Sequence, residues 1–244
     1  MKIALVQNAP VKGNPDKSLA ELDRLIGKGC GADIYVLPEM FATGQYIDPT
    51  PVVQTMNGQI IQWLQNKAKQ LDAAVCGTLP VAENSHVYNR LCFCTPDGSI
   101  SYYDKHHLFS YSGESQHFTP GSDRVVVKFR GLRILLLICY DLRFPIFSRN
   151  HDDYDAVIYP ANWPDKRILA WDTLLRARAI ENQGHACIDC QGTDVLLSQM
   201  PDLIFHQGYK RSNDQTHAVH SQSRYLEGDG LTTTCRHQAQ GIFP

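Results

Sequence analysis

The sequence contains no apolar run long enough to cross a membrane, although it holds 244 residues. A membrane-spanning helix needs about 20 consecutive apolar residues. The first residues, 1–8, carry only a short apolar run, far below the length of a secretory signal. We therefore expect a protein of the cytoplasm that does not bind membranes.

The chain also lacks an excess of charge of either sign. Lysine and arginine together number 23 and aspartate and glutamate 25, which gives a formal net charge of −2. No run of lysines and arginines exceeds two adjacent residues before the C-terminal segment. Such a balance provides no electrostatic attraction to the phosphates of nucleic acids or to an acidic membrane surface.

The eight cysteines are scattered and form no disulfide or zinc-finger pattern. Cys76, Cys92 and Cys94 lie in apolar segments typical of strands, and we expect reduced thiols in a chain without a signal peptide. Cys187 and Cys190 have the spacing of half a zinc site or of a redox pair. Because no second pair and no suitably spaced histidine follows, we expect no metal site.

Apolar patterns predict strands that alternate with amphipathic helices. Predicted helices cover residues 14–27, 58–71 and 165–182, the last with Ile168, Leu169, Leu175, Ala179 and Ile180 on its inward side. Predicted strands cover residues 2–7, 32–37, 73–81, 87–95, 99–104, 125–129, 132–139 and 155–159. This order predicts an α/β protein whose sheets are covered by helices. Periodicity alone does not indicate whether two sheets stack on each other.

Three predicted strands end in residues capable of acid–base or nucleophilic chemistry. Glu39 follows residues 32–37, Lys105 follows residues 99–104, and Cys139 ends the apolar segment 132–139. A thiol placed between a buried strand and a helix start has a lowered pKa and lies near backbone donors for an oxyanion. By itself, Cys139 is equally well explained as a small core residue, and Glu39 with Lys105 as an ion pair at a sheet edge.

The segments around these residues, in the order Glu, Lys, Cys, resemble the nitrilase or carbon–nitrogen hydrolase superfamily. They read LPEMF at 37–41, YDKHHLF at 103–109 and ICYDLRFP at 138–145. The resemblance implies a four-layer α-β-β-α sandwich of two mixed sheets. It also implies a homodimer that acts on a small-molecule amide and needs no metal and no organic cofactor.

The resemblance implies roles for five residues. Cys139 would be the nucleophile, since an amide carbonyl is a poor electrophile and needs an activated thiol. Glu39 would be the general base, and Lys105 with the backbone N–H of Tyr140 would stabilise the oxyanion. Glu114 lies in the loop where the family carries a second glutamate that positions the substrate or the lysine. The alternative interpretation of Glu114 is a surface carboxylate without a catalytic role.

Histidines near the lysine allow a competing hypothesis, a cysteine–histidine hydrolase. They are His106, His107 and His117. Because no papain-like or caspase-like context surrounds Cys139, we interpret them as loop residues or residues behind the site. Asp141 and Arg143 are predicted to fix the turn after the cysteine through buried ion pairs.

The segment Asn162–Trp163–Pro164, with Arg167 and Trp171, resembles the ω-amidase branch of the superfamily. That branch hydrolyses the terminal amide of α-keto acid amides such as α-ketoglutaramate. Arg167 is our candidate for binding the substrate carboxylate, and Phe41 and Trp163 for lining the pocket, although both aromatics suit a core equally well. The alternatives are an N-carbamoyl or aliphatic amidase and an inactive scaffold or binding protein.

The resemblance covers residues 1–183, which we predict to be a carbon–nitrogen hydrolase domain. Residues 184–244 depart from the family pattern and would complete the same domain imperfectly. From residue 206 the chain is polar and rich in His, Gln and Ser, with no sustained period. Genuine divergence and an out-of-frame reading would both produce such a segment. We expect residues 206–244 to pack poorly.

Overall fold

The computed structural model describes residues 1–27, 31–182, 186–189, 204–207, 222–226 and 232–236. Twelve strands in these ranges form a sheet of six, a sheet of four and a separate pair. None of the helices in this part of the chain has the length and apolar character needed to cross a membrane.

The larger sheet has the strand order β10-β1-β2-β3-β4-β5. Its bounds are β1 Lys2–Leu5, β2 Ile34–Val36, β3 Ala74–Glu83, β4 His86–Cys94, β5 Ile100–Asp104 and β10 Ile204–Gln207. The strands β10, β1, β2 and β3 run parallel, whereas β3, β4 and β5 are joined antiparallel. The predicted strands 87–95 and 99–104 are β4 and β5, and a turn at Pro96–Asp97–Gly98 joins them into a hairpin.

The smaller sheet has the order β6-β7-β8-β9. Its bounds are β6 Val125–Phe129, β7 Leu132–Leu136, β8 Ala156–Tyr159 and β9 Ala186–Asp189. β6 and β7 are antiparallel, and β7, β8 and β9 are parallel. β11 (Gln222–Leu226) and β12 (Thr232–Arg236) pair only with each other.

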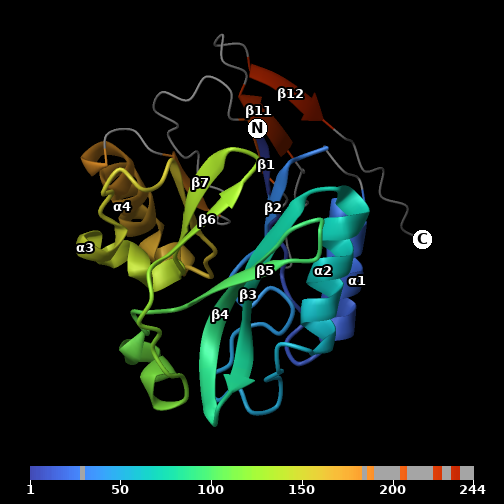
Figure 1. The fold of residues 1–244 in the computed structure, drawn as a ribbon, viewed down its shortest axis with the longest axis vertical. Helices are drawn as coiled ribbons and strands as arrows, with labels where there is room; N and C mark the ends of the chain where they lie inside the picture. Colours follow the sequence, from blue (N-terminus) through green and yellow to red (C-terminus); the bar gives the residue numbers. More distant parts are fainter. Residues whose placement is uncertain (28–30, 183–185, 190–203, 208–221, 227–231, 237–244) are drawn as a thin grey trace.

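Helices cover the outer face of each sheet (Figure 1). α1 (Pro15–Ile26) begins as predicted, because the Asn14 side chain accepts a hydrogen bond from the N–H of Lys17 and a proline opens the first turn. With α2 (Gln59–Leu71) it packs apolar side chains on the larger sheet. α3 (Pro145–Ser148) and α4 (Ile168–Glu181) lie on the opposite side, with the smaller sheet.

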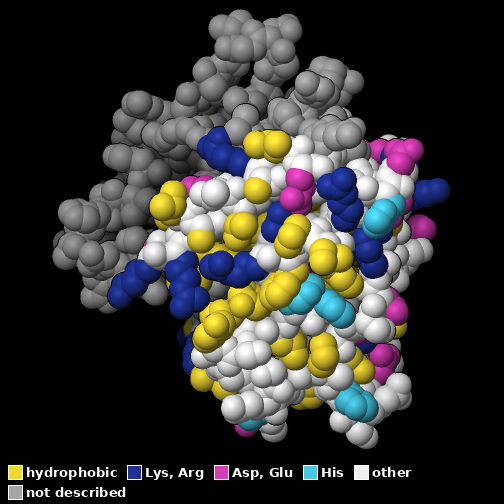
Figure 2. Space-filling view, turned by 90° about the vertical axis from the view of Figure 1, so that its left-hand side faces the viewer, with side chains coloured by type: hydrophobic (Ala, Val, Ile, Leu, Met, Phe, Trp, Pro, Cys, Tyr) yellow, Lys and Arg dark blue, Asp and Glu magenta, His cyan; other side chains and the backbone are white. Residues whose placement is uncertain are grey.

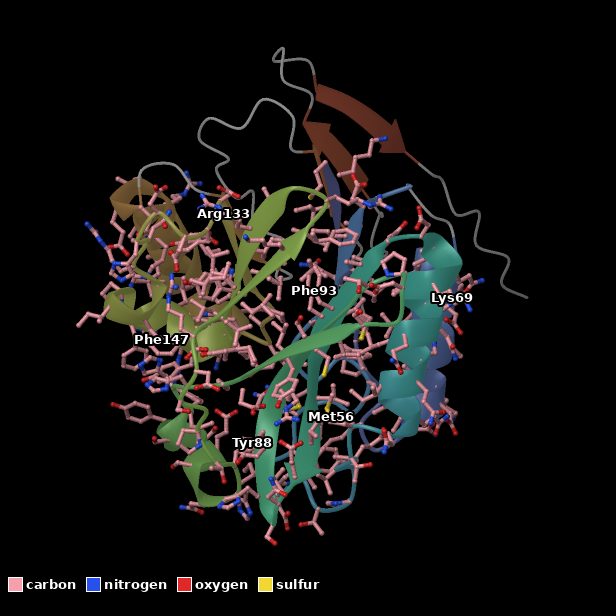
Figure 3. All side chains as sticks on the ribbon, viewed as in Figure 1. Met56, Lys69, Tyr88, Phe93, Arg133 and Phe147 are labelled. Atoms are coloured by element: carbon pink, nitrogen blue, oxygen red, sulfur yellow. The ribbon has the colours of Figure 1, made fainter. Side chains whose placement is uncertain are left out.

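A second core fills the space between the two sheets. Phe93 of β4 meets Phe129 of β6 edge to face, with ring centroids 6.0 Å apart (Figure 3). Cys92 and Cys94 share the opposite face, toward α1 and α2, as their alternation with Phe93 predicts. The fold is therefore the predicted four-layer sandwich of two mixed sheets between helices.

The strand predicted over residues 132–139 is shorter than expected. β7 ends at Leu136, although the N–H groups of Leu137 and Cys139 still bond to the carbonyls of Ile158 and Pro160, at 3.0 Å each. Cys139 has φ +42°, a left-handed conformation that L-residues rarely adopt, and this turns the chain out of the sheet. The cysteine thus stands beyond the strand, at the start of a short 3₁₀ helix.

The outward side of α4 differs from the prediction. Leu169 and Ile180 are 78% and 76% exposed, whereas Trp171 and Leu175 are buried against the smaller sheet. Since the helix is apolar on two sides, the sequence pattern does not reveal which side faces inward.

Two predictions concern residues that lie largely outside the described ones. We expect residues 206–244 to pack poorly, but of these residues the structure describes only the end of β10 and the strands β11 and β12. The side chains of Cys187 and Cys190 are likewise outside the described set. Both remain predictions.

Candidate active site

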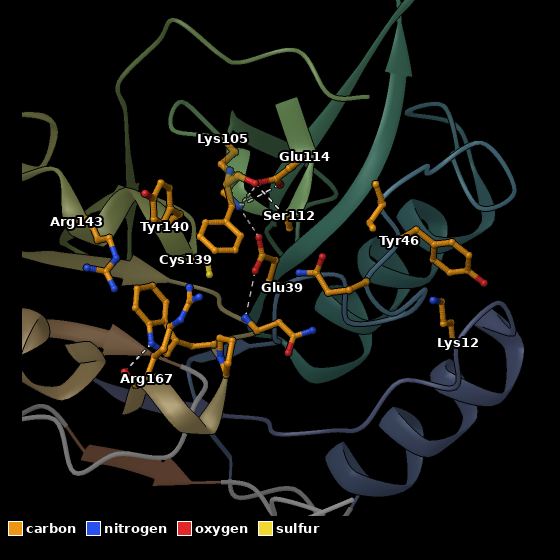
Figure 4. A pocket seen from close by; sticks show the side chains of 16 residues that line it. Lys12, Glu39, Tyr46, Lys105, Ser112, Glu114, Cys139, Tyr140, Arg143 and Arg167 are labelled. Carbon is orange, nitrogen blue, oxygen red and sulfur yellow. Dashed lines mark hydrogen bonds and ion pairs between the residues drawn. The ribbon is translucent and has the colours of Figure 1, made fainter. Parts of the chain in front are cut away.

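A cavity of about 270 Å³ opens where strands of both sheets end (Figure 4). Seven of the eight predicted site residues line it: Glu39, Lys105, Glu114, Cys139, Tyr140, Trp163 and Arg167. The eighth, Phe41, does not. The cavity is also lined by Lys12, Gln45, Tyr46, Ile47, Phe109, Ser112, Arg143, Asn162 and Pro164.

Strand ends bring three reactive side chains together from distant parts of the chain. Glu39 lies just beyond β2 and Lys105 directly after β5, both in the larger sheet, whereas Cys139 follows β7 of the smaller sheet. The N–H of Glu39 reaches the carbonyl of Ala161, beyond β8, at 3.4 Å. The site therefore lies at the junction of the two sheets.

Lys105 holds two carboxylates at once. Its Nζ lies 2.9 Å from Oε1 of Glu39 and 2.9 Å from Oε2 of Glu114, and all three side chains are buried. Burial alone would lower the pKa of the ammonium, but the two carboxylates together raise it above its ordinary value. Lys105 is therefore a permanent cation at the base of the cavity.

Glu114 is fixed by the loop that carries it. The loop contains the 3₁₀ turns η1 (Ser110–Ser112) and η2 (Glu114–Gln116), and the N–H of Phe109 donates to Oε2 of Glu114 at 2.6 Å. With 9% of its surface exposed, Glu114 is not the surface carboxylate of the alternative interpretation.

Asn89 is a site residue that the sequence reasoning missed. Its Nδ2 donates to Oε1 of Glu39 at 2.9 Å and to Oε1 of Glu114 at 3.0 Å, so it bridges the same two carboxylates as Lys105. Its carbonyl also accepts the N–H of Lys105 at 2.9 Å. A polar pair, Asn89 and Arg90, in the middle of the strand β4 was the available signal, because such side chains are seldom buried without a partner.

Cys139 occupies the first position of the 3₁₀ helix η3 (Cys139–Arg143). Burial raises the pKa of its thiol well above the ordinary value, the neighbouring Glu39 carboxylate raises it further, and Lys105 opposes both. The expectation of a lowered pKa was therefore wrong, because the turn places the sulfur in a buried position beside a negative charge. The resting thiol keeps its proton and needs a base.

The backbone around the cysteine offers hydrogen-bond donors to the cavity. The N–H of Tyr140 belongs to the first turn of η3, where backbone N–H groups have no partner within the helix. The N–H of Asn162 donates to Oε2 of Glu39 at 3.2 Å and also interacts with the Cys139 sulfur. These donors lie where an oxyanion or a thiolate would form.

Asp141 and Arg143 have different positions, although both were predicted in buried ion pairs. Asp141 is buried, and its Oδ2 accepts the N–H of Ile138 at 3.0 Å, which fixes the turn as expected. Arg143 is exposed and lines the cavity, with its guanidinium 5.2 Å from the ring centroid of Trp163. The expectation for Arg143 was wrong because its side chain leaves the turn on the solvent side.

Cations surround the cavity mouth. Arg143 and Arg167 lie on one side of Cys139, and Lys12 and Tyr46 lie on the other (Figure 4). The guanidinium of Arg167 lies 5.5 Å from the ring centroid of Phe109, and its carbonyl accepts the indole N–H of Trp163 at 2.9 Å. The entrance therefore favours an anionic ligand.

Phe41 is a core residue and not a pocket residue. It is fully buried among the side chains that α1 and α2 pack on the larger sheet, and its ring centroid lies 6.1 Å from that of Trp63. The left-handed Met40, at φ +55°, separates it from Glu39. The prediction that Phe41 lines the pocket was wrong for this reason.

A metal site is not formed by the residues described here. No group of three or more His, Cys, Asp or Glu side chains among them is arranged to hold a metal ion. At the base of the cavity, the carboxylates of Glu39 and Glu114 instead accept hydrogen bonds from Lys105 and Asn89.

A thiol beside a carboxylate and an ammonium, at the junction of two stacked sheets, defines a class of hydrolases that attack C–N bonds through a covalent intermediate. Residues 2–218 match the sequence model of the carbon–nitrogen hydrolase family, and the chain belongs to this family. The match extends beyond residue 183, where the resemblance had been expected to stop.

Curated relatives are similar in sequence to this protein over about three quarters of the chain. The "Omega-amidase YafV" of Escherichia coli (strain K12) is 41% identical over 185 residues, 76% of this chain and 72% of the relative. The "2-oxoglutaramate amidase" of Bacillus subtilis (strain 168) is 34% identical over 189 residues, 75% of this chain and 73% of the relative. With its family membership, these relatives identify the chain as an amide-hydrolysing enzyme.

Solved structures show the same architecture. The crystal structure of XC1258 from Xanthomonas campestris, a CN-hydrolase superfamily protein, superposes with a TM-score of 0.75 at 32% identity. It covers 98% of this chain and 87% of its own. Nit3 of Saccharomyces cerevisiae shares the fold, with a TM-score of 0.67 at 21% identity over 96% of this chain and 88% of that chain.

Proposed function

We propose that the protein is an ω-amidase, which hydrolyses the terminal amide of a small α-keto acid amide such as α-ketoglutaramate. The observation that carries the proposal is one cavity with the Cys139–Glu39–Lys105 set at its base and two arginines at its mouth. Relatives named omega-amidase and 2-oxoglutaramate amidase support the same specificity.

Acylation begins with transfer of the Cys139 proton to Glu39. The thiolate attacks the amide carbon, and the oxyanion is stabilised by the ammonium of Lys105 and the N–H of Tyr140. Glu39 then returns the proton to the amide nitrogen, the C–N bond breaks, and ammonia leaves. A thioester on Cys139 remains.

Deacylation uses the same base. Glu39 takes a proton from water as the water attacks the thioester carbon, and the same donors stabilise the second oxyanion. The C–S bond then breaks, the carboxylic acid product leaves, and the proton returns to the sulfur. Glu114 and Asn89 hold Glu39 and Lys105 in place through both halves of the reaction.

Arg143 and Arg167 suit the substrate carboxylate, because a guanidinium binds a carboxylate through paired, charge-assisted hydrogen bonds. Trp163 contacts both residues, with its ring facing Arg143 and its indole N–H bonded to the backbone carbonyl of Arg167. An aliphatic amidase would gain nothing from these cations. They favour a substrate with a free carboxylate over that alternative and over an N-carbamoyl amidase lacking such a group.

The test is ammonia release from α-ketoglutaramate by the wild-type protein and by Cys139→Ala, with pentanamide as a neutral amide of equal chain length. We expect release by the wild type alone, and a much lower kcat/KM for pentanamide. Arg143→Met and Arg167→Met should raise KM for the keto acid amide by about 10- to 100-fold. Equal use of both amides by the wild type would contradict the assigned specificity.

We further propose that the enzyme is a homodimer formed through α3 and α4. Leu169 and Ile180 stand eleven positions apart on one side of α4, and Ile146 of α3 is 89% exposed. Figure 2 shows hydrophobic and basic side chains mixed on the side of the molecule that carries these helices. An exposed apolar surface of this kind is typical of an interface between subunits.

Two further proposals concern the whole chain. Residues 184–244 would complete the domain of residues 1–183, because β9 pairs with β8 and β10 pairs with β1. The cytoplasm is the location we propose, since the four described cysteines are all free and the reaction needs a reduced thiol.

A further inference from the structure

Four hydrogen bonds converge on the buried carboxylate of Asp141. Its Oδ2 accepts the N–H of Ile138 at 3.0 Å and the hydroxyl of Tyr103 at 2.8 Å. Its Oδ1 accepts the N–H of His107 at 2.9 Å and lies 2.8 Å from Nδ1 of the same histidine. Tyr103 and His107 lie in and just after β5 of the larger sheet, whereas Ile138 follows β7 of the smaller sheet.

These contacts surround the two charged partners of the reaction. Tyr103 and His107 stand two positions before and two positions after Lys105, and Ile138 directly precedes Cys139. The N–H of His106 also donates to the Tyr103 hydroxyl, at 3.1 Å. Asp141 therefore fixes the lysine segment of one sheet to the cysteine turn of the other.

His107 supplies the side chain that completes this arrangement. Its Nδ1 lies 2.8 Å from Oδ1 of Asp141, whose side chain is fully buried. Its ring stacks on Phe144 with centroids 3.7 Å apart and an interplanar angle of 3°. That stacking holds Nδ1 toward the carboxylate and so fixes the tautomer that donates to it.

Tyr103 is a constant donor in the same arrangement. Burial raises the pKa of its hydroxyl far above the ordinary value, and the Asp141 charge raises it further. The hydroxyl therefore stays protonated over the working range of the enzyme. A left-handed Cys139 needs such support, because the surrounding contacts must stabilise a strained backbone.

We propose that His107 and Asp141 form a positioning pair that sets the place of the Cys139–Tyr140 backbone relative to Lys105, and thereby aligns the two donors to the oxyanion. The inference rests on the proposed thiol mechanism and adds to it a histidine that touches neither substrate nor reacting atoms. Small displacements of such donors lower turnover more than substrate binding.

The variants separate this role from simple packing. His107→Ala removes the donor and the ring, whereas His107→Asn restores a donor close to the position of Nδ1. His86→Ala is the control, since the Nδ1 of His86 also contacts a backbone carbonyl, that of Asn84 at 2.8 Å, but His86 is exposed at the start of β4 and does not line the cavity. Tyr103→Phe removes a different donor to Asp141 and serves if His107→Ala fails to fold.

We expect His107→Ala to lower kcat by about 10- to 100-fold with KM within about threefold, and His107→Asn to recover most of the loss. Tyr103→Phe should lower kcat similarly, and His86→Ala should retain wild-type constants. Unchanged kcat in both His107→Ala and Tyr103→Phe would overturn the proposal. So would a His107→Asn enzyme that is no better than His107→Ala.

A second measurement keeps this test separate from the proposed function. Alkylation of Cys139 by iodoacetamide, followed by mass spectrometry of its peptide, needs no amide turnover. We expect alkylation of Cys139 in His107→Ala to be slowed several-fold relative to the wild type, with His86→Ala unchanged. Failure of the wild type to release ammonia would remove the ω-amidase assignment alone, whereas equal alkylation rates in all variants would remove the positioning pair.

Discussion

Cys139 and Glu39 are coupled through the proton that they share. The thiol is buried and its pKa is raised, so the nucleophile exists only when the carboxylate accepts the proton. Such a site keeps the sulfur unreactive until a substrate arrives. The other described cysteines, Cys76, Cys92 and Cys94, are fully buried and their pKa values are also raised by burial, but none of them lines the cavity.

This coupling predicts opposite effects of Glu39→Gln on two measurements. Turnover should fall by at least about 10³-fold, because no group then carries the proton to ammonia or activates water. Removal of the negative charge leaves Lys105 as the nearby ion, so the thiol pKa should fall. Alkylation of Cys139 at pH 7 should then become faster by up to about tenfold.

The control for this prediction is Cys139→Ala, which should lose both turnover and labelling at that peptide. Slower alkylation in Glu39→Gln than in the wild type would show that Glu39 activates the thiol for every electrophile. The coupling described above would then have the wrong sign.

Among single residues, the sequence predicts those that can be recognised from their position directly after a strand. Glu39, Lys105 and Cys139 each follow an apolar strand, and this pattern is visible without coordinates. Asn89 and Arg143 could not be assigned, because their roles depend on which way a side chain points in the folded chain. The prediction for Phe41 was wrong for the same reason, because the left-handed backbone of Met40, which precedes it, cannot be inferred from the sequence.

Secondary-structure elements place the reactive groups through their ends, and one glycine supports such an end. The N–H of Gly121 donates to the carbonyl of Lys105 at 3.0 Å. A Cβ at Gly121 would lie 2.3 Å from the backbone oxygen of Asp104, the last residue of β5. Only a glycine allows the loop to pass this close to the strand end.

Gly121→Ala should therefore displace the end of β5 and the adjacent Lys105. We expect kcat to fall by about 10- to 100-fold while KM changes little, because displacements below an ångström affect the aligned groups most. Steady-state kinetics with α-ketoglutaramate measures the effect. Ser122→Ala, at the next, exposed position, should behave like the wild type, and a fully active Gly121→Ala enzyme would contradict the argument.

Element boundaries were less predictable than the elements themselves. The apolar pattern predicts a strand up to Cys139, and the hydrogen bonds of Leu137 and Cys139 do continue toward the neighbouring strand. The regular ladder nevertheless ends at Leu136, because the following turn is fixed by Asp141 and by Arg178 of α4, whose Nε donates to the Leu142 carbonyl at 3.0 Å. These tertiary contacts have no signature in a local pattern.

For the whole molecule, the four layers could not be derived from periodicity, since sheet stacking depends on contacts between distant segments. The resemblance of three motifs to a family supplied that architecture. For the exposed residues of α4, by contrast, the sequence pattern was misleading. Leu169 and Ile180 read as core residues in the sequence and lie on the surface of the described chain.

A homodimer through this surface predicts a loss of association when charge is introduced there. Leu169→Glu combined with Ile180→Glu should convert a dimer into a monomer, because buried carboxylates at an interface are strongly unfavourable. Light scattering coupled to size-exclusion chromatography measures the mass. Gln70→Glu, an added carboxylate on α2 at the other side of the molecule, should leave the mass unchanged. A wild-type monomer would contradict the proposal.

The location of the site between the two sheets has a mechanical consequence. Glu39 and Lys105 are attached to one sheet and Cys139 to the other, so a molecule bonded to both sides connects two layers of the sandwich. A covalent inhibitor on the sulfur that also accepts a hydrogen bond from Lys105 would resist sliding of one sheet over the other. Catalytic activity, in turn, reports how well the two layers are aligned.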